Sequence, residues 1–237
     1  LGGLEGEVMN YSPEIKHMPF IQTLTSIIVV AIENKRFASE LLEQEVQKKE
    51  IQVAGEMQKL LFPLEFPKNK YIEVAARYEP KHLVGGDYYD FIVLNESEYF
   101  FCIADVSGKG VAAALLMSNF QANLRAIIKY NYMKISLEDL IKNLNEDVNN
   151  AAKGEKFITF FAAHYNGKTK TLQYINAGHN YPILVDHQNT KLLNKGCIGL
   201  GMLEKIPKIE IEKFRVEPNS VLVCYTDGIV ELENNNG

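Results

Sequence analysis

Residues 85–110 read GGDYYDFIVLNESEYFFCIADVSGKG, and this stretch decides the fold. Its two apolar runs, residues 89–94 and 99–106, have the composition of β-strands and flank the turn residues Asn95-Glu96-Ser97. The pattern therefore predicts a β-hairpin. An aspartate stands near each outer end of that hairpin, Asp87 before the first run and Asp105 near the end of the second.

The pattern after the hairpin turns helical over residues 110–130. A second helix is predicted from Ser136, whose hydroxyl can cap it, with Asp139 three positions on. Strand patterns then return, and Asn166-Gly167 predicts a second hairpin with a type I′ turn. The further strands are predicted at residues 72–78, 157–165, 170–175, 183–187, 208–216 and 221–226. Strands, two helices and strands again predict an α+β fold with mostly antiparallel pairing, not a doubly wound nucleotide fold.

The segment before the hairpin, residues 20–61, reads as a long helix without proline. Its second half is charged and carries a thin apolar stripe in which Val46, Val53 and Leu60 stand seven residues apart. One interpretation is a surface helix packed on its own domain. The interpretation we favour is an interdomain or dimer-forming helix, whose coiled coil is weakened by Gly55 and by polar seam positions.

The bulk composition excludes several classes of protein. With 237 residues, 46% apolar content and a net charge of −5, the chain is ordinary for a globular protein, and its scattered lysines and arginines argue against a nucleic-acid partner. The longest aliphatic run, residues 27–32, is too short to be a membrane segment. Cys102, Cys197 and Cys224 form neither a metal-ligand spacing nor a disulfide framework, which favours a cytoplasmic location.

Three aspartates are the candidate metal ligands and candidate catalytic residues: Asp87, Asp105 and Asp227. Each lies at or just beyond a strand-like run, and Asp87 and Asp227 have a glycine as a direct neighbour. Hard divalent cations such as Mg²⁺ and Mn²⁺ prefer carboxylate oxygens, and glycine lets the main chain approach an ion closely. The alternative is that each Asp-Gly pair only marks a turn. Three such aspartates at strand ends favour a metal site.

The glycine-rich segment Ser107-Gly108-Lys109-Gly110 resembles a phosphate loop but lacks the Walker A pattern, which needs Gly at Ile103 and Ser or Thr at Gly110. The free amides of a helix N-terminus attract anions, so Gly108, Lys109 and Gly110 form a possible phosphate side of the site. A solvated surface role for Lys109 is the preferred alternative. His179 near a turn is interpreted as structural, and no Ser-His-Asp or Cys-His arrangement is evident.

Several stretches, taken in order, resemble the SpoIIE/RsbU-type branch of the metal-dependent (PPM) serine/threonine protein phosphatases. They are Met57-Gln58-Lys59-Leu60-Leu61 with Pro63, residues 84–91, 104–117, 157–161 and 176–182, and residues 225–231 with Asn234. The resemblance implies an antiparallel β-sandwich flanked by helices, with two Mn²⁺ or Mg²⁺ ions at one end.

The resemblance also implies roles for individual residues. Asp105 would bridge two metal ions, the Val106 carbonyl and Asp227 would complete the ligand set, and Asp87 would bind a metal or hold its water. A hydroxide on the ions would then hydrolyse phosphoserine or phosphothreonine on a STAS-type anti-sigma antagonist. The alternative is a catalytically degenerate, phosphatase-like module that serves as a protein-binding adaptor.

Residues 11–41 resemble, more weakly, the end of a GAF sensor domain, with Ala31-Ile32-Glu33-Asn34 in its closing helix. The expected organisation is a GAF-like remnant at residues 1–34, a regulatory helical linker at 35–62 that makes the homodimer, and a phosphatase domain at 63–237. Since the chain opens at Leu1 and its first methionine is Met9, we expect it to be part of a longer protein. The family continues past Asn234 and supplies a further metal-binding aspartate there, so we expect the phosphatase domain to be truncated.

Overall fold

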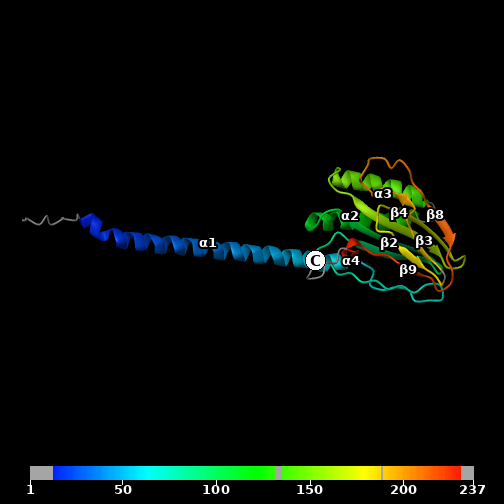
Figure 1. Ribbon diagram of the computed structural model, residues 1–237, viewed down its shortest axis with the longest axis horizontal. Coiled ribbons are helices and arrows are strands. Elements are labelled where there is room, and N and C mark those ends of the chain that lie inside the picture. Colours follow the sequence, from blue (N-terminus) through cyan, green and yellow to red (C-terminus); the bar gives the residue numbers. More distant parts are fainter. Residues whose placement is uncertain (1–12, 132–134, 188, 231–237) are drawn as a thin grey trace, which may run out of the picture. The chain divides into compact units, whose positions relative to one another are not determined.

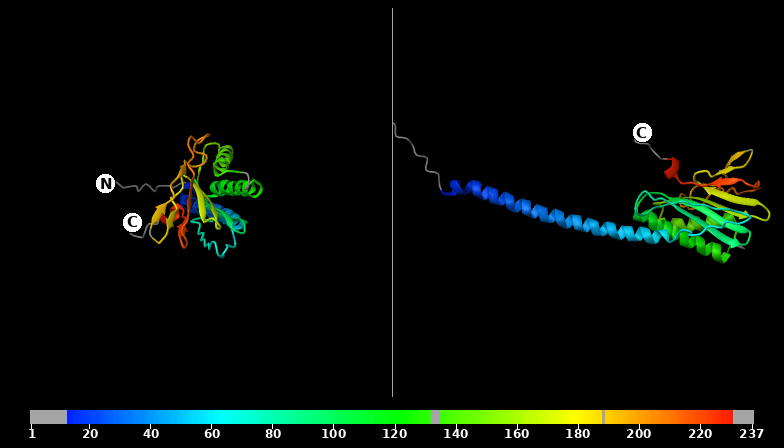
Figure 2. Two further views of the ribbon diagram at one scale, coloured as in Figure 1. Left: turned by 90° about the vertical axis from the view of Figure 1, so that its right-hand side faces the viewer. Right: turned by 90° about the horizontal axis from the view of Figure 1, so that it is seen from below.

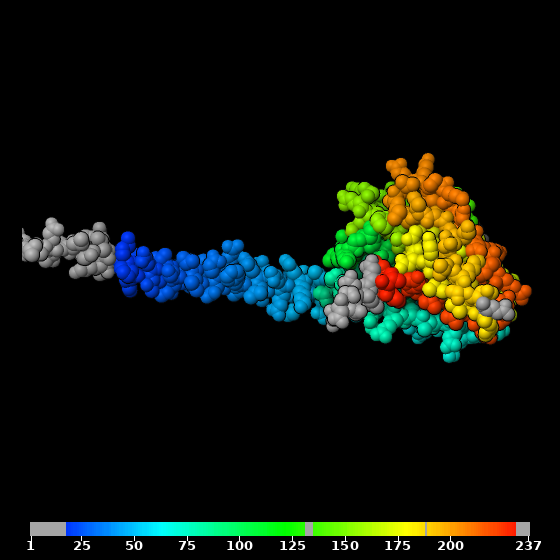
Figure 3. Space-filling model, viewed as in Figure 1, coloured from blue at the N-terminus to red at the C-terminus, as the bar shows by residue number. Residues whose placement is uncertain are grey.

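The computed structural model describes residues 13–131, 135–187 and 189–230, and the chain divides into two compact units, Leu1–Glu50 and Ile51–Gly237. The described part of the first unit is a single helix, blue in Figure 3, in which every residue from 18 to 50 is exposed. This helix, α1, spans Pro13–Lys59 and so ends within the second unit. The predicted long helix is confirmed, although it begins earlier than expected and includes Pro19.

The second unit is built on a large mixed sheet (Figure 1). Its strand order is β1-β2-β3-β4-β7, with β8 also paired to β4. Neighbours are antiparallel except for β4 and β7, which are parallel. The strands are β1 Tyr88–Asn95, β2 Glu98–Val106, β3 Ile158–Asn166, β4 Thr171–Ala177, β7 Gly196–Cys197 and β8 Glu212–Arg215. The first hairpin is therefore confirmed, since β1 and β2 pair with Tyr88 opposite Ala104.

Two helices, α2 (Val111–Asn131) and α3 (Leu137–Ala152), lie on the same face of the large sheet (Figure 2). Their apolar faces meet inward side chains of the strands in one continuous core that includes Met117, Phe120, Leu144, Phe160 and Ile175. The predicted cap of the second helix is confirmed, because the Ser136 hydroxyl accepts a hydrogen bond from the Asp139 amide at 3.0 Å.

A smaller sheet makes the second layer of the unit. It has the order β6-β5-β9, from Thr190–Leu192, Ile183–Val185 and Val221–Val223. A second core lies between the two sheets, where Phe161, Leu172 and Tyr174 of the large sheet pack with Leu184 of β5. The last element, α4, is a single turn at Asp227–Val230. The predicted α+β sandwich with flanking helices is thus confirmed.

A buried ion pair joins the first strand to the helical layer. The Asp90 carboxylate is 2% exposed and accepts hydrogen bonds from the Arg125 guanidinium at 2.7 and 2.9 Å. The same carboxylate also accepts a hydrogen bond from the Tyr88 hydroxyl at 2.6 Å and another from the Phe91 amide at 2.8 Å. With four donors Asp90 is well satisfied inside the protein, which is the condition under which a buried charge is tolerated.

Two details of the strand prediction are wrong. Residues 72–78 form no strand; the only pairing near them is an isolated bridge between Lys68 and Glu73, so this apolar run has no ladder partner. The turn after β3 has four residues rather than two, since Asn166 pairs directly with Thr171. The Asn166 side chain accepts bonds from the amides of Lys168 and Thr169, and this local capping closes the longer turn.

Helix α2 is long and apolar enough, over Val111–Tyr130, to pass a length-and-composition test for a membrane span. Counting aliphatic runs alone did not reveal this. However, Ala113, Met117 and Leu124 of this helix are fully buried in the core against the sheet. We therefore describe α2 as a core helix.

Candidate metal centre

The three aspartates singled out from the sequence converge at one end of the sandwich. Asp87 lies just before β1, Asp105 is the second-last residue of β2, and Asp227 begins α4. One carboxylate oxygen from each lies within 4.8 Å of the others, although Asp87 and Asp227 are far apart in the chain. The first hairpin brings Asp87 and Asp105 together, and β9 delivers Asp227 to the same end.

The electrostatics of this cluster favour a cation. Burial raises the pKa of Asp87, and the negative charge of Asp227 raises it further, while hydrogen bonds with Thr226 and Asp105 act in the opposite direction. The Thr226 hydroxyl donates to the Asp87 carboxylate at 2.9 Å. Carboxylates this close repel one another, and an oxygen-preferring divalent cation removes that repulsion. The donor set therefore fits Mg²⁺ or Mn²⁺.

The main chain also approaches the cluster closely. A Cβ placed on Gly86 would lie 2.9 Å from the Val106 carbonyl oxygen, so glycine is required where the end of β2 passes the Asp87 loop. This places the Val106 carbonyl beside Gly86, the residue before Asp87, and its role as a further oxygen ligand stays a prediction.

The glycine-rich segment after β2 leads directly into α2. Gly108 and Gly110 have φ of 90° and 77°, values that side chains rarely allow, so the loop depends on both glycines. Lys109 is exposed, in agreement with the solvated role that we preferred. The lysine that contacts this loop is Lys156, whose ammonium donates to the Ser107 carbonyl at 3.1 Å. No sequence motif had marked Lys156 as a candidate.

His179 is buried, with only 3% of its surface exposed. Its amide donates to the Asn176 side chain at 2.7 Å, and its Nδ1 lies 2.9 Å from the Thr159 hydroxyl, which donates in turn to the Asp105 carbonyl at 3.4 Å. Burial lowers the pKa of His179 to about 4, although the Tyr225 main chain and the charge of Asp227 oppose the shift. A neutral imidazole thus supports the ends of β2 and β3, which agrees with the predicted structural role.

The end of α1 is tied to the Asp87 loop. The Gln58 side chain donates to the Gly85 carbonyl at 2.9 Å and accepts from the Gly85 amide at 3.0 Å. Gln58 is 7% exposed, whereas Val46, Val53 and Leu60 of the predicted seam are all at least half exposed. The end of the helix thus contacts the second unit through Gln58, and the dimer-forming role of the exposed seam stays a prediction.

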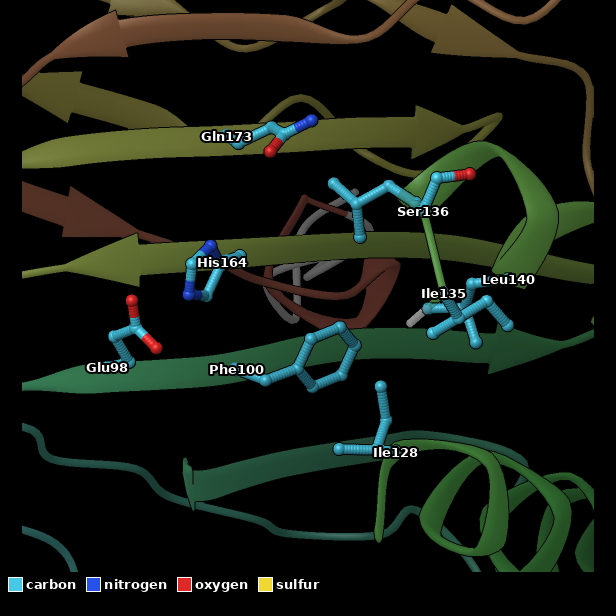
Figure 4. A pocket seen from close by; sticks show the side chains of 9 residues that line it. Glu98, Phe100, Ile128, Ile135, Ser136, Leu140, His164 and Gln173 are labelled. Carbon is cyan, nitrogen blue, oxygen red and sulfur yellow. The ribbon is translucent and has the colours of Figure 1, made fainter. Parts of the chain in front are cut away.

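A cavity of about 380 Å³ lies at the other end of β2 from Asp105 (Figure 4). Phe100 and Leu140 form part of its apolar wall, and Glu98, His164 and Gln173 add polar groups from three adjacent strands. Burial lowers the pKa of His164, with Lys213 adding to the shift and Glu98 opposing it. None of the predicted site residues lines this cavity.

Three supporting residues were missed from sequence: Lys156, Thr159 and Thr226. Thr226 precedes Asp227 and Lys156 precedes the Phe157 stretch, so their positions in the matching motifs could have drawn attention to them.

With this geometry established, comparison with solved structures identifies the fold as that of PP2C-type phosphatase domains. The PP2C phosphatase domain of SpoIIE from Bacillus subtilis, solved with a fragment of its regulatory domain, matches with a TM-score of 0.55 and 18% identity over 65% of this chain and 45% of that chain. The SiaA-PP2C domain of Pseudomonas aeruginosa matches with a TM-score of 0.57 and 14% identity over 76% of this chain and 71% of that one.

Residues 95–237 match the family model described as stage II sporulation protein E (SpoIIE), and the chain belongs to this family. Among curated proteins it is similar to the phosphoserine phosphatase RsbU of Bacillus subtilis (strain 168), with 31% identity over 199 residues. That alignment covers 83% of this chain and 57% of RsbU. The chain spans about half the length of the curated relatives it matches.

Proposed function

We propose that this chain is the catalytic part of a metal-dependent phosphoprotein phosphatase that hydrolyses phosphoserine or phosphothreonine. The observation that carries the proposal is the convergence of Asp87, Asp105 and Asp227 at the end of a PP2C-like sandwich. Membership of the SpoIIE family and similarity to a phosphoserine phosphatase support the same activity.

Two Mn²⁺ or Mg²⁺ ions would be held by Asp87, Asp105, Asp227 and the Val106 carbonyl, with Asp105 between them. When bound, the ions supply a nucleophile by lowering the pKa of water and stabilise negative charge on the phosphoryl group. Asp87 is oriented by Thr226, and the end of β2 that carries Asp105 is held by Thr159 and His179. The loop main chain at Gly108 and Gly110, together with Lys156, would form the side on which the phosphate is received, with Lys109 solvated beside it.

The substrate that the family resemblance implies is a phosphorylated STAS-domain anti-sigma antagonist in a bacterial partner-switching pathway, which fits a cytoplasmic location. The similarity to RsbU supports this choice. Control by a GAF-like sensor ahead of residue 35 is part of the same proposal, and its first residues, 1–12, lie outside the described part of the chain. The signal would pass through the linker helix at residues 35–62, which forms a homodimer.

The decisive experiment is a Mn²⁺ titration of phosphatase activity, with a phosphorylated STAS domain and with p-nitrophenyl phosphate. We expect turnover of both that depends on Mn²⁺ and disappears in EDTA. Turnover of p-nitrophenyl phosphate but not of the phosphorylated STAS domain would contradict the proposed substrate. Absence of both activities, with tight binding of the phosphoprotein, would favour the adaptor alternative.

A further inference from the structure

The hydroxyl of Tyr78 is buried without a hydrogen-bond partner among the described residues. The Tyr78 ring stacks on the Phe62 ring, with the two centroids 4.4 Å apart, and packs against the main core. Buried hydroxyls are normally paired, because an unpaired one forfeits its hydrogen bonds with water. An unpaired hydroxyl on a well-packed ring therefore needs an explanation.

The position of this hydroxyl supplies one. A Cβ placed on Gly85 would lie 2.4 Å from the Tyr78 oxygen, so the hydroxyl rests directly against the first glycine of the Gly85-Gly86-Asp87 loop. Burial, and after it the negative charge of Asp87, raises the pKa of the Tyr78 phenol to about 12. A phenol with this pKa keeps its proton at neutral pH and is available as a hydrogen-bond donor.

The remaining contacts of the loop leave this donor unused. Gln58 satisfies the amide and carbonyl of Gly85, and Thr226 donates to the Asp87 carboxylate. Tyr78 thus lies against the loop that carries Asp87, with a hydroxyl proton that no described group accepts. Residues that hydrogen-bond to the ligand shell of a metal commonly orient it and tune its affinity.

We propose that Tyr78 is a positioning residue for the metal centre, and that its hydroxyl donates to a group of the coordination shell on the Asp87 side once the ions are bound. This inference rests on the proposed function, since it takes the three aspartates to be metal ligands. It predicts that the Tyr78 hydroxyl lowers the stability of the metal-free protein and strengthens the binding of the metal ions. A residue that only packs would show no such reversal.

The test compares the full chain with its Tyr78→Phe variant, which keeps the ring and removes the oxygen. Mn²⁺ binding is measured by isothermal titration calorimetry, and thermal melting is followed in EDTA. We expect an approximately tenfold weaker Mn²⁺ affinity. The melting temperature in EDTA should rise by about 2 to 6 °C, because the unpaired hydroxyl is gone.

The matched control is Tyr165→Phe, at a half-buried tyrosine stacked on Tyr99 at the other end of the sheet from Asp105. We expect its Mn²⁺ affinity to be that of the unaltered chain. Unchanged Mn²⁺ affinity in Tyr78→Phe, or a lower melting temperature in EDTA, would overturn the inference. An unaltered chain that binds no Mn²⁺ would instead refute the proposed metal centre itself, so the two failures are distinct.

Discussion

Gln58, at the end of α1, holds both main-chain polar groups of Gly85, two residues before the metal-site candidate Asp87. A single side-chain amide thus links the linker helix to the loop that positions a carboxylate. A Cβ on Gly55, one helical turn earlier, would lie 2.0 Å from the Leu83 carbonyl, so the helix and this loop are in direct contact over two positions. Displacement of the helix end would therefore disturb Asp87.

Replacing Gln58 with alanine should weaken metal binding and destabilise the fold. The change leaves the amide and carbonyl of Gly85 buried without partners, which costs about 1–3 kcal/mol. Urea unfolding in EDTA measures that loss, and Mn²⁺ calorimetry measures the affinity, which we expect to fall several-fold. Gln52→Ala, at an exposed position of the same helix, is the control and should stay within about 0.5 kcal/mol. Unchanged Mn²⁺ affinity in Gln58→Ala would show that the contact only supports the fold.

Asparagine substitutions separate the aspartates by role. Asp105→Asn should reduce turnover at least a hundredfold, on the order of 3 kcal/mol, because a neutral amide weakens both ions that a bridging carboxylate holds. The fold should survive, since the change also relieves repulsion within the cluster. Asp227→Asn should mainly raise the Mn²⁺ concentration needed for half-maximal activity. Near-normal turnover of Asp105→Asn at saturating Mn²⁺ would exclude the bridging role.

The two lysines near the glycine-rich loop should behave differently. Lys109 is exposed, so Lys109→Ala should leave kcat and KM nearly unchanged. Lys156 holds the Ser107 carbonyl and stands against Gly108, so Lys156→Ala should raise KM for the phosphorylated substrate several-fold at constant Mn²⁺ affinity. A tenfold fall in kcat for Lys109→Ala would show that the exposed lysine has the larger role.

The elements that depend on neighbouring residues were predicted correctly from the sequence. A strand that depends on a partner far along the chain was not. The β1–β2 hairpin and the Ser136 cap follow from neighbouring residues, and both are present. Residues 72–78 had the composition of a strand but lack a ladder partner, which composition does not reveal.

The candidate site shows the same division. The three aspartates were identified from their positions beside strand-like runs, and two of them, Asp87 and Asp227, also from a neighbouring glycine. The contacts that orient them, such as Gln58 with Gly85 or Thr226 with Asp87, join residues far apart in the chain, and only the folded arrangement reveals them.

The buried His179 should make stability depend on pH. Its pKa is about 4 in the folded chain, below the ordinary 6.5, so folding favours the neutral ring. The stabilisation is complete above pH 6.5 and is lost as the pH falls toward 4, by about 2 kcal/mol at pH 5. Urea unfolding in EDTA should therefore show that the free energy of unfolding falls more between pH 7 and pH 5 in the unaltered chain than in His179→Gln. The exposed His187→Gln serves as control, and equal losses in all three proteins would contradict the assignment.

The exposed stripe of the linker helix leads to the last prediction. Val46 and Val53 of α1, with Leu60 just after its end, are seven residues apart and at least half exposed, and apolar residues at this spacing are typical of helices that pair with a second copy. A helix that joins a sensor to an enzyme can regulate it only if two packing arrangements favour different states of the site. The glycine at position 55 and the polar seam positions keep the pairing weak, as such an element requires.

We therefore expect a homodimer through roughly residues 20–60 that Val53→Glu weakens, because the substitution places a charge in the seam. Sedimentation velocity at tens of micromolar measures the dimer, and Mn²⁺-dependent turnover measures the coupling. Gln52→Glu adds the same charge one position away and should leave both unchanged. The Gln58 contact connects this helix to the Asp87 loop, so basal turnover should change in Val53→Glu, while the isolated catalytic domain still binds Mn²⁺. A monomeric unaltered chain, with identical turnover in Val53→Glu, would reduce the helix to a passive connection.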